Sequence, residues 1–173
     1  IVGEPAVLDL YDSFDTTRRV TAIFSKAQTS YHNDGSIWLD ATLRPEAWLQ
    51  SRGRDNRSFQ MKSVPDIVKE VLSDVNHRWE ITKSYPVYEY IVQYREDDWT
   101  FAIRLLEKEG IYFWFDHEAG SQLVMSDNST AAPDLVGGAY IDVRDKSGLT
   151  HDREVVEALG GVSTVVPTKF FQK

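Results

Sequence analysis

The side chains in this sequence that could carry out chemistry are carboxylates and histidines, because the chain contains no cysteine. Asp97 with Asp98, and Glu107 with Glu109, are close acid pairs of the kind that could suggest a glycoside hydrolase. Asp97 and Asp98 fit better at the start of a helix, where acids stabilise the positive end of the helix dipole. Glu107 and Glu109 would project to different faces of that helix. We therefore predict a protein that is not an enzyme and has no catalytic residues.

The four histidines do not have the spacing of metal ligands: they are His32, His77, His117 and His151. Without cysteine, a zinc site would need distant histidines and carboxylates to converge. The sequence also lacks a G-x-S-x-G nucleophile elbow and a glycine-rich phosphate loop. We predict no metal and no cofactor, and we interpret the histidines as surface or hairpin residues.

Charge and length exclude further classes. A formal net charge of −8 in 173 residues argues against nucleic-acid binding, which depends on clustered lysine and arginine. The densest basic stretch, residues 52–57, is interrupted by an acid, and we interpret it as a solvated loop. No apolar run approaches the roughly 20 residues that cross a bilayer. The sequence starts at Ile1 and not at methionine, so we expect a fragment of a longer chain.

Two helices are indicated by their end signals. Ser63 can cap the first, with Pro65 in the first turn and an acid three residues after the serine. The apolar residues that follow recur at helical spacing and form one stripe: Val64, Ile67, Val68, Val71, Leu72 and Val75. The second helix begins at Asp97 and ends at Gly110, since glycine readily adopts the left-handed conformation that terminates helices. Pro45 can open a third, short helix.

Short runs of apolar and aromatic residues predict strands at residues 7–11, 20–24, 37–44, 87–94, 111–115 and 122–125, with shorter candidates at 139–143, 162–166 and 168–171. Residues 111–125 should form a β-hairpin. The order strand, helix, hairpin predicts a helix that packs across a mixed sheet. The fold class is therefore α+β and mainly β, with two to three helices packed on mixed sheets.

The aromatic residues point to a core and to an interface. The run at residues 112–115 has no polar alternation, so both of its faces should be covered, by the domain core or by another chain. We expect Tyr94 and Phe113 to fill the core. Trp38, on the polar face of its strand, and Trp114 are the residues that we expect at a subunit interface, because aromatic residues are enriched there.

Two long motifs carry a resemblance to a known family. The first is FQMKSVPDI at residues 59–67, preceded by LRP at residues 43–45. The second is VQYREDDWTFAIRLLEKEGIYF at residues 92–113. Together they cover roughly residues 37–128, and the match weakens after Ala139. In these motifs the sequence resembles the VgrG family, the spike proteins of type VI secretion systems.

The resemblance implies a structural part of an injection machine. VgrG proteins resemble the hub and spike of contractile phage tails, with barrel-like β-domains in a trimeric hub. The expected partners are two further copies of the chain, the hexameric Hcp tube and baseplate proteins, without nucleic acid. The assembled spike would puncture the target membrane without a transmembrane helix. It would assemble in the bacterial cytoplasm and then be secreted or delivered into the target cell.

The resemblance also suggests a domain plan and leaves two alternatives. Residues 1–173 would be one tail-hub-like region, in which 1–32 and 127–173 belong to a first barrel and 33–126 form a strand–helix–hairpin subdomain. One alternative is the baseplate hub of a contractile phage or prophage tail. The other, from a different class, is a cell-wall-degrading glycoside hydrolase, which would need two carboxyl groups about 5 to 10 Å apart in a cleft.

Overall fold

The computed structural model describes residues 1–11, 17–131, 140–143, 155–156 and 158–161. Ile1–Ala132 form one compact unit and Pro133–Lys173 a second. In the second unit, β9 (Asp142–Val143) pairs in parallel with β10 (Val155–Val156). The strands predicted at residues 162–166 and 168–171, and His151, lie outside the described residues.

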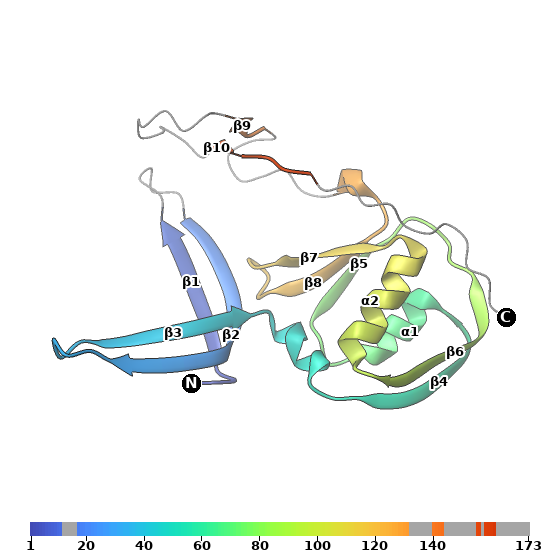
Figure 1. The fold of residues 1–173 in the computed structure, drawn as a ribbon. Helices are drawn as coiled ribbons and strands as arrows, with labels where there is room; N and C mark the ends of the chain where they lie inside the picture. The colour runs from blue at the N-terminus through green and yellow to red at the C-terminus, as the bar shows by residue number, and fades with distance from the viewer. Residues whose placement is uncertain (12–16, 132–139, 144–154, 157, 162–173) are drawn as a thin grey trace. The chain divides into compact units, whose positions relative to one another are not determined.

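The first unit contains three sheets, two α-helices and two short 3₁₀ helices within the described residues (Figure 1). In chain order its elements are β1 (Pro5–Tyr11), β2 (Thr17–Tyr31), β3 (Ile37–Arg44), η1 (Glu46–Ser51), β4 (Asp55–Ser63), α1 (Val64–Val71), β5 (His77–Glu80), β6 (Val87–Glu96), α2 (Asp98–Glu109), β7 (Tyr112–Asp116), β8 (Gln122–Ser126) and η2 (Ser129–Ala131). The sheets have the strand orders β1-β2-β3, β4-β6 and β5-β8-β7.

The long strand β2 belongs to two successive hairpins. Its first half, residues 17–23, pairs antiparallel with β1, and its second half pairs antiparallel with β3. The register shifts between Phe24 and Lys26, where a β-bulge increases the local twist of the strand. Beyond the bulge, β2 has β3 as its partner, so residues 26–42 form a two-stranded ribbon with its turn (Figure 1).

The helix ends lie where local chemistry predicts them. The Ser63 hydroxyl accepts a hydrogen bond from the Asp66 N–H, with Pro65 in the first turn of α1. Asp97 caps α2 in the same way by accepting from the Thr100 N–H at 2.8 Å. Gly110 ends α2 at φ +71°, and the Ile111 N–H then donates to the Leu106 carbonyl at 2.9 Å. Both predicted helices are therefore confirmed.

The hydrophobic core of the first unit lies around the two α-helices, between the β4–β6 and β5–β8–β7 sheets (Figure 1). The fully buried members are Val64, Ile67, Val68 and Leu72 of the first helical region, Phe101, Ala102, Leu105 and Leu106 of α2, and Leu123 and Met125 of β8. Phe59 of β4 stacks on Phe101 with ring centroids 5.6 Å apart. Trp99 contacts Phe113 and Phe115, which covers one face of the predicted aromatic run.

The predicted fold class is confirmed, with a correction to the closure of the sheets. The hairpin β7–β8 forms as predicted, and its sheet is mixed because β5 runs parallel to β8. Strands β4 and β5 were not predicted from the sequence. The strand before α2 is β6, and it pairs with β4 and not with the hairpin. The predicted barrel-like closure is not found in the part of the chain that the structure describes, where all sheets are open. The division into 1–32 with 127–173 and 33–126 stays a prediction.

Candidate interaction surfaces

The β2–β3 ribbon carries an exposed apolar face. In the observed register Ala27 pairs with Ala41, Thr29 with Leu39 and Tyr31 with Ile37, so these side chains share one face of the ribbon. We call this set of six residues the ribbon face. Tyr31 is 79% exposed, Ile37 64% and Leu39 52%. Such a cluster of large exposed apolar side chains is typical of an interaction site.

The opposite side of the ribbon is polar and holds Trp38. The residues beside it on that side are Lys26, Gln28, Ser30, Asp40 and Thr42. Trp38 is 61% exposed, its indole N–H donates to the Ser36 hydroxyl at 3.1 Å, and its ring lies 5.3 Å from that of His32. These local contacts hold an aromatic side chain in solvent. The structure therefore leaves Trp38 accessible to a partner.

Trp114, the second predicted contact residue, lies on β7 in a different sheet. Its ring stacks on that of Tyr112 with centroids 5.6 Å apart, and both residues are half-buried. The Tyr112 hydroxyl donates to the Asn128 carbonyl at 2.7 Å, which fixes this face of the hairpin. Trp38 and Trp114 belong to different sheets, and their role at an interface stays a prediction.

The outer face of the β4–β6 sheet forms a second exposed surface. Tyr90, Val92 and Tyr94 alternate along β6 and are all exposed. They lie opposite Gln60, Ser58 and Asn56 of β4, on the face away from the helices. The expectation that Tyr94 fills the core is wrong, because Tyr94 is 66% exposed. Alternation along β6 placed these residues on one face but did not indicate which face the helices cover.

A buried polar network joins this sheet to the start of α2. Gln93 is completely buried, and its amide donates to the Asp98 carboxylate at 2.7 Å and to the Glu96 carbonyl at 3.0 Å. Arg57 donates to the Gln93 side-chain oxygen at 2.9 Å and also pairs with Asp98. Residues 55–57 thus begin β4 and are not the predicted solvated loop. The Asp98 carboxylate is therefore held by Gln93 and Arg57 in this network.

Asp127 fixes the connection between β5 and β6. Its carboxylate accepts hydrogen bonds from the Thr82 N–H and hydroxyl, the Lys83 N–H and the Tyr85 hydroxyl, at 2.8 to 3.0 Å. Burial alone would raise the pKa of Asp127, but these donors outweigh it and hold the pKa well below its ordinary value. Burial and the neighbouring carboxylate raise the pKa of Tyr85 to about 12.

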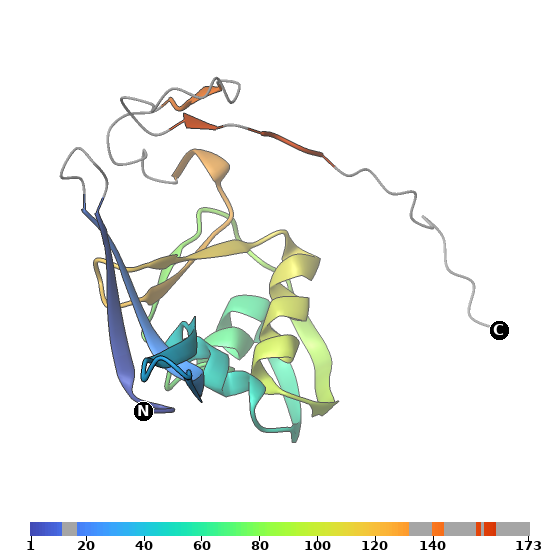
Figure 2. The same ribbon diagram turned by 60° about the vertical axis from the view of Figure 1, so that its left-hand side comes forward.

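Several of the other acids and histidines considered as chemical groups also have structural contacts. Asp97 caps α2, and Glu109 accepts from the Tyr88 hydroxyl at 2.6 Å. His77 Nδ1 lies 2.7 Å from the Val75 carbonyl. His117 joins the β7–β8 turn to β2, since the Thr21 hydroxyl donates to its carbonyl at 3.2 Å. The β7–β8 turn and the β1–β2 hairpin can be followed in Figure 2. Within the described ranges, no three His, Asp or Glu residues gather as a metal site.

The described helices also bear on the membrane question. None of them is long and apolar enough to cross a membrane. The structure thus offers exposed apolar and aromatic surfaces on a helix-supported scaffold, and Asp97, Asp98, Glu109 and Asp127 are held by a cap or by hydrogen bonds. These features favour binding to other protein chains over a reaction.

A family model described as phage tail baseplate hub (GPD) matches residues 1–173. The chain belongs to the phage tail baseplate hub family. It is 48% identical over 131 residues to the type VI secretion system spike protein VgrG1c of Pseudomonas aeruginosa, which covers 73% of this chain and 18% of that protein. It is 31% identical over 167 residues to the actin cross-linking toxin VgrG1 of Vibrio cholerae, covering 87% of this chain and 15% of that protein.

Solved hub structures show the same fold. An Escherichia coli component of the type VI secretion system, described as structurally similar to the T4 tail proteins gp27 and gp5, superimposes with a TM-score of 0.67 at 22% identity. That match covers 77% of this chain and 38% of the other. A chain of a Francisella PdpA–VgrG complex gives a TM-score of 0.55 at 18% identity, and the match covers 86% of this chain and 26% of that chain.

These comparisons confirm the resemblance to VgrG proteins and the tail-hub fold. The chain spans less than a fifth of the length of the two curated relatives named above. It therefore corresponds to one region of those proteins.

Proposed function

We propose that this chain is the tail-hub region of a type VI secretion spike protein and acts as a structural component. The observation that carries the proposal is the exposed ribbon face on a chain of the hub family with close VgrG relatives. An isolated two-stranded ribbon is marginally stable in water, so a partner surface that covers its apolar side would stabilise it.

The proposed assembly is a homotrimer in the full-length protein. A threefold hub docks the needle onto the Hcp tube hexamer, with baseplate proteins around it, so that the spike can puncture the target membrane and deliver effectors. In a threefold ring each copy presents the same two complementary surfaces, and the ribbon face with Trp38 is suited to be one of them. The spike would assemble in the bacterial cytoplasm before it is secreted or delivered.

The proposed role needs no catalysis in this region. Asp97, Asp98 and Glu109 are held as a cap, a network acid and an acceptor for Tyr88. One relative is named an actin cross-linking toxin, and this chain covers 15% of it. Enzymatic activity in such relatives is therefore no argument for activity in these residues.

A second candidate is the baseplate hub of a contractile phage or prophage tail. The description of the family model favours it, whereas 48% identity to a secretion spike favours the first candidate. The two differ in the tube to which the hub binds. Specific binding to a phage tail-tube protein instead of Hcp would favour the second.

The experiment is to purify the full-length protein and measure its mass by light scattering, then sediment it with assembled Hcp tubes. We expect a trimer that sediments with the tubes, and a tube protein of unrelated sequence serves as the control. A protein that is monomeric at micromolar concentration and does not sediment with Hcp tubes would contradict the proposal. Release of products from peptidoglycan by the purified hub region would contradict its structural, non-catalytic role.

A further inference from the structure

Two arginines share one tryptophan at the end of the ribbon. Arg44 ends β3, and Arg52 follows η1 directly. The guanidinium carbon of Arg44 lies 5.0 Å from the Trp48 ring centroid, and that of Arg52 lies 5.1 Å from it. The two cations are therefore within about 10 Å of each other, and both are held by the same cation–π partner.

The backbone around Trp48 gives this arrangement a defined geometry. The Trp48 N–H donates to the Pro45 carbonyl at 2.9 Å, and the Arg52 N–H donates to the Leu49 carbonyl at 3.0 Å. The Ser51 hydroxyl adds a bond of 2.7 Å to the Trp48 carbonyl. Arg44 and Arg52 thus flank a single short 3₁₀ helix that is closed by hydrogen bonds.

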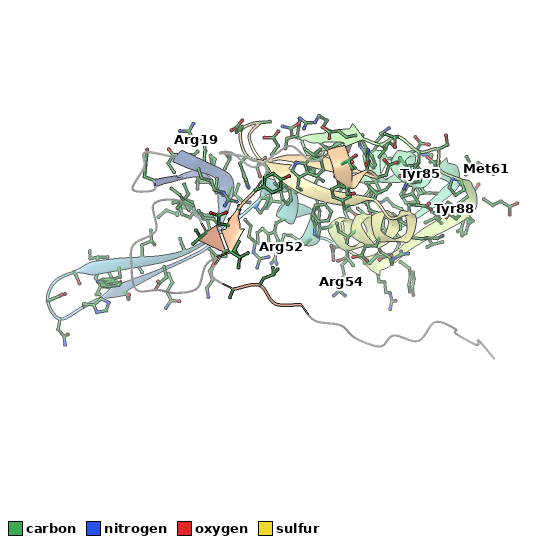
Figure 3. The ribbon with its side chains drawn as sticks, turned by 90° about the horizontal axis from the view of Figure 1, so that it is seen from above. Arg19, Arg52, Arg54, Met61, Tyr85 and Tyr88 are labelled. Atoms are coloured by element: carbon green, nitrogen blue, oxygen red, sulfur yellow. The ribbon has the colours of Figure 1, made fainter. Side chains whose placement is uncertain are left out.

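Neither cation has an acidic partner in the described part of the chain. Arg19, Arg57, Arg78 and Arg104 each form an ion pair there, while Arg44, Arg52 and the exposed Arg54 form none. Arg52 and Arg54 lie in the connection between η1 and β4, and both are labelled in Figure 3. In a protein with eight more acidic than basic residues, two arginines thus share Trp48 and a third follows two residues after Arg52, and none of the three has an ion-pair partner in the described residues.

The chemistry of the cluster selects a carboxylate ligand. Guanidinium groups present a planar pair of donors that matches a carboxylate, and stacking on Trp48 fixes their orientation before a ligand arrives. Nucleic acid is disfavoured, because it requires an extended basic surface and this chain is acidic outside the cluster. Tryptophan and arginine are also the residue types that dominate binding energy at protein interfaces.

We propose that Arg44, Trp48, Arg52 and Arg54 form a docking site for an acidic segment of a neighbouring protein chain. We name these four residues the arginine cluster. The inference rests on the proposed function for the nature of the neighbour, which would be a component of the assembled spike. The cluster would bind at least two carboxylates of that segment, one on each stacked arginine, with Arg54 at the solvent edge.

The test uses the full-length protein and a fluorescently labelled hexaglutamate peptide, followed by anisotropy at low salt. The variant carries Arg44→Gln, Arg52→Gln and Arg54→Gln. The control carries Arg18→Gln, Lys26→Gln and Lys83→Gln, which remove the same charge from side chains without an ion pair in the described residues. We expect at least tenfold weaker peptide binding for the variant and less than threefold for the control.

Two further arms make the outcome decisive. Arg54→Gln alone removes an exposed side chain without a described contact, so the protein should fold normally and bind the peptide at least threefold more weakly. Equal losses in the triple variant and its control would overturn the proposal. So would polyphosphate that binds more tightly than the peptide and depends on the same arginines. Trimer formation, measured in parallel, separates this result from the proposed function, because peptide binding does not require a trimer.

Discussion

The helical core buries its apolar side chains, whereas the β2–β3 ribbon exposes similar apolar side chains to solvent. In the core, Val64, Val68 and Phe101 are completely buried. On the ribbon, Ile37, Trp38 and Leu39 are all more than half exposed. The difference follows from layers: α1 and α2 cover one face of the β4–β6 sheet, whereas nothing in the described residues covers the ribbon face. The core supplies stability, and the ribbon face is the surface that we propose for binding.

The comparison predicts the largest difference between two leucine substitutions. Leu105→Ala removes a buried side chain from the centre of the core and should destabilise the chain by about 2–5 kcal/mol. Leu39→Ala makes the same chemical change on the ribbon face and should cost within about 0.5 kcal/mol. Urea denaturation followed by circular dichroism measures both. Equal losses would mean that the ribbon face is packed in solution.

The end of α2 predicts the next largest effect. Gly110 adopts φ +71°, where an added Cβ is strained, so Gly110→Ala should cost about 1–2 kcal/mol. Gly53 has open space around it and no left-handed φ, which makes Gly53→Ala a matched control with a change near zero. If both variants unfold at the same urea concentration, Gly110 does not determine the helix end.

The Asp127 contacts predict a pH-dependent effect. Because the folded pKa of Asp127 is lowered, its contribution to stability is present above the ordinary pKa of a free aspartate and is lost as pH falls toward the folded value. Asp127→Asn should therefore lower the urea midpoint at pH 7, and the gap to wild type should narrow below about pH 4. Asp74→Asn, at an exposed carboxylate, is the control. A gap that is constant with pH would contradict the assignment.

The smallest effect is expected on the outer face of the β4–β6 sheet. Tyr94→Ser replaces an exposed side chain and should change the free energy of unfolding by within about 0.5 kcal/mol. Tyr88→Phe is the informative partner, since it removes the hydroxyl that donates to Glu109 and should cost about 1 kcal/mol. A larger loss of unfolding free energy for Tyr94→Ser than for Tyr88→Phe would indicate that the Tyr94 side chain packs in the core.

Local chemistry explains what could be predicted from the sequence. Ser63, Asp97 and Gly110 identify helix ends because their capping bonds involve residues three to five positions away. Strand β4 was missed because its outward positions are polar and its partner β6 is about 30 residues away, so no local pattern reports the pairing. The parallel pairing of β5 with β8 is more distant still.

The sequence predicted aromatic contact residues but did not locate the ribbon face. Trp38 could be named because an aromatic residue on a polar strand face is conspicuous in the sequence. Tyr31 and Ile37 could not be named as contact residues, because the sequence of an apolar strand face is the same whether or not another layer covers it. The arginine cluster was missed because Arg44 and Arg52 approach each other only through Trp48. The arginines of residues 52–57 divide between that cluster and the buried network of Arg57.

We propose that the ribbon face binds another copy of the chain. The most direct test of this proposal is the mass of the full-length protein carrying Ile37→Ser and Leu39→Ser, compared with Asp40→Ser and Thr42→Ser on the opposite side of the same strand. We predict that the first pair reduces the trimer to monomers at micromolar concentration with unchanged circular dichroism, while the second pair stays trimeric. A trimer that survives Ile37→Ser and Leu39→Ser would contradict the account.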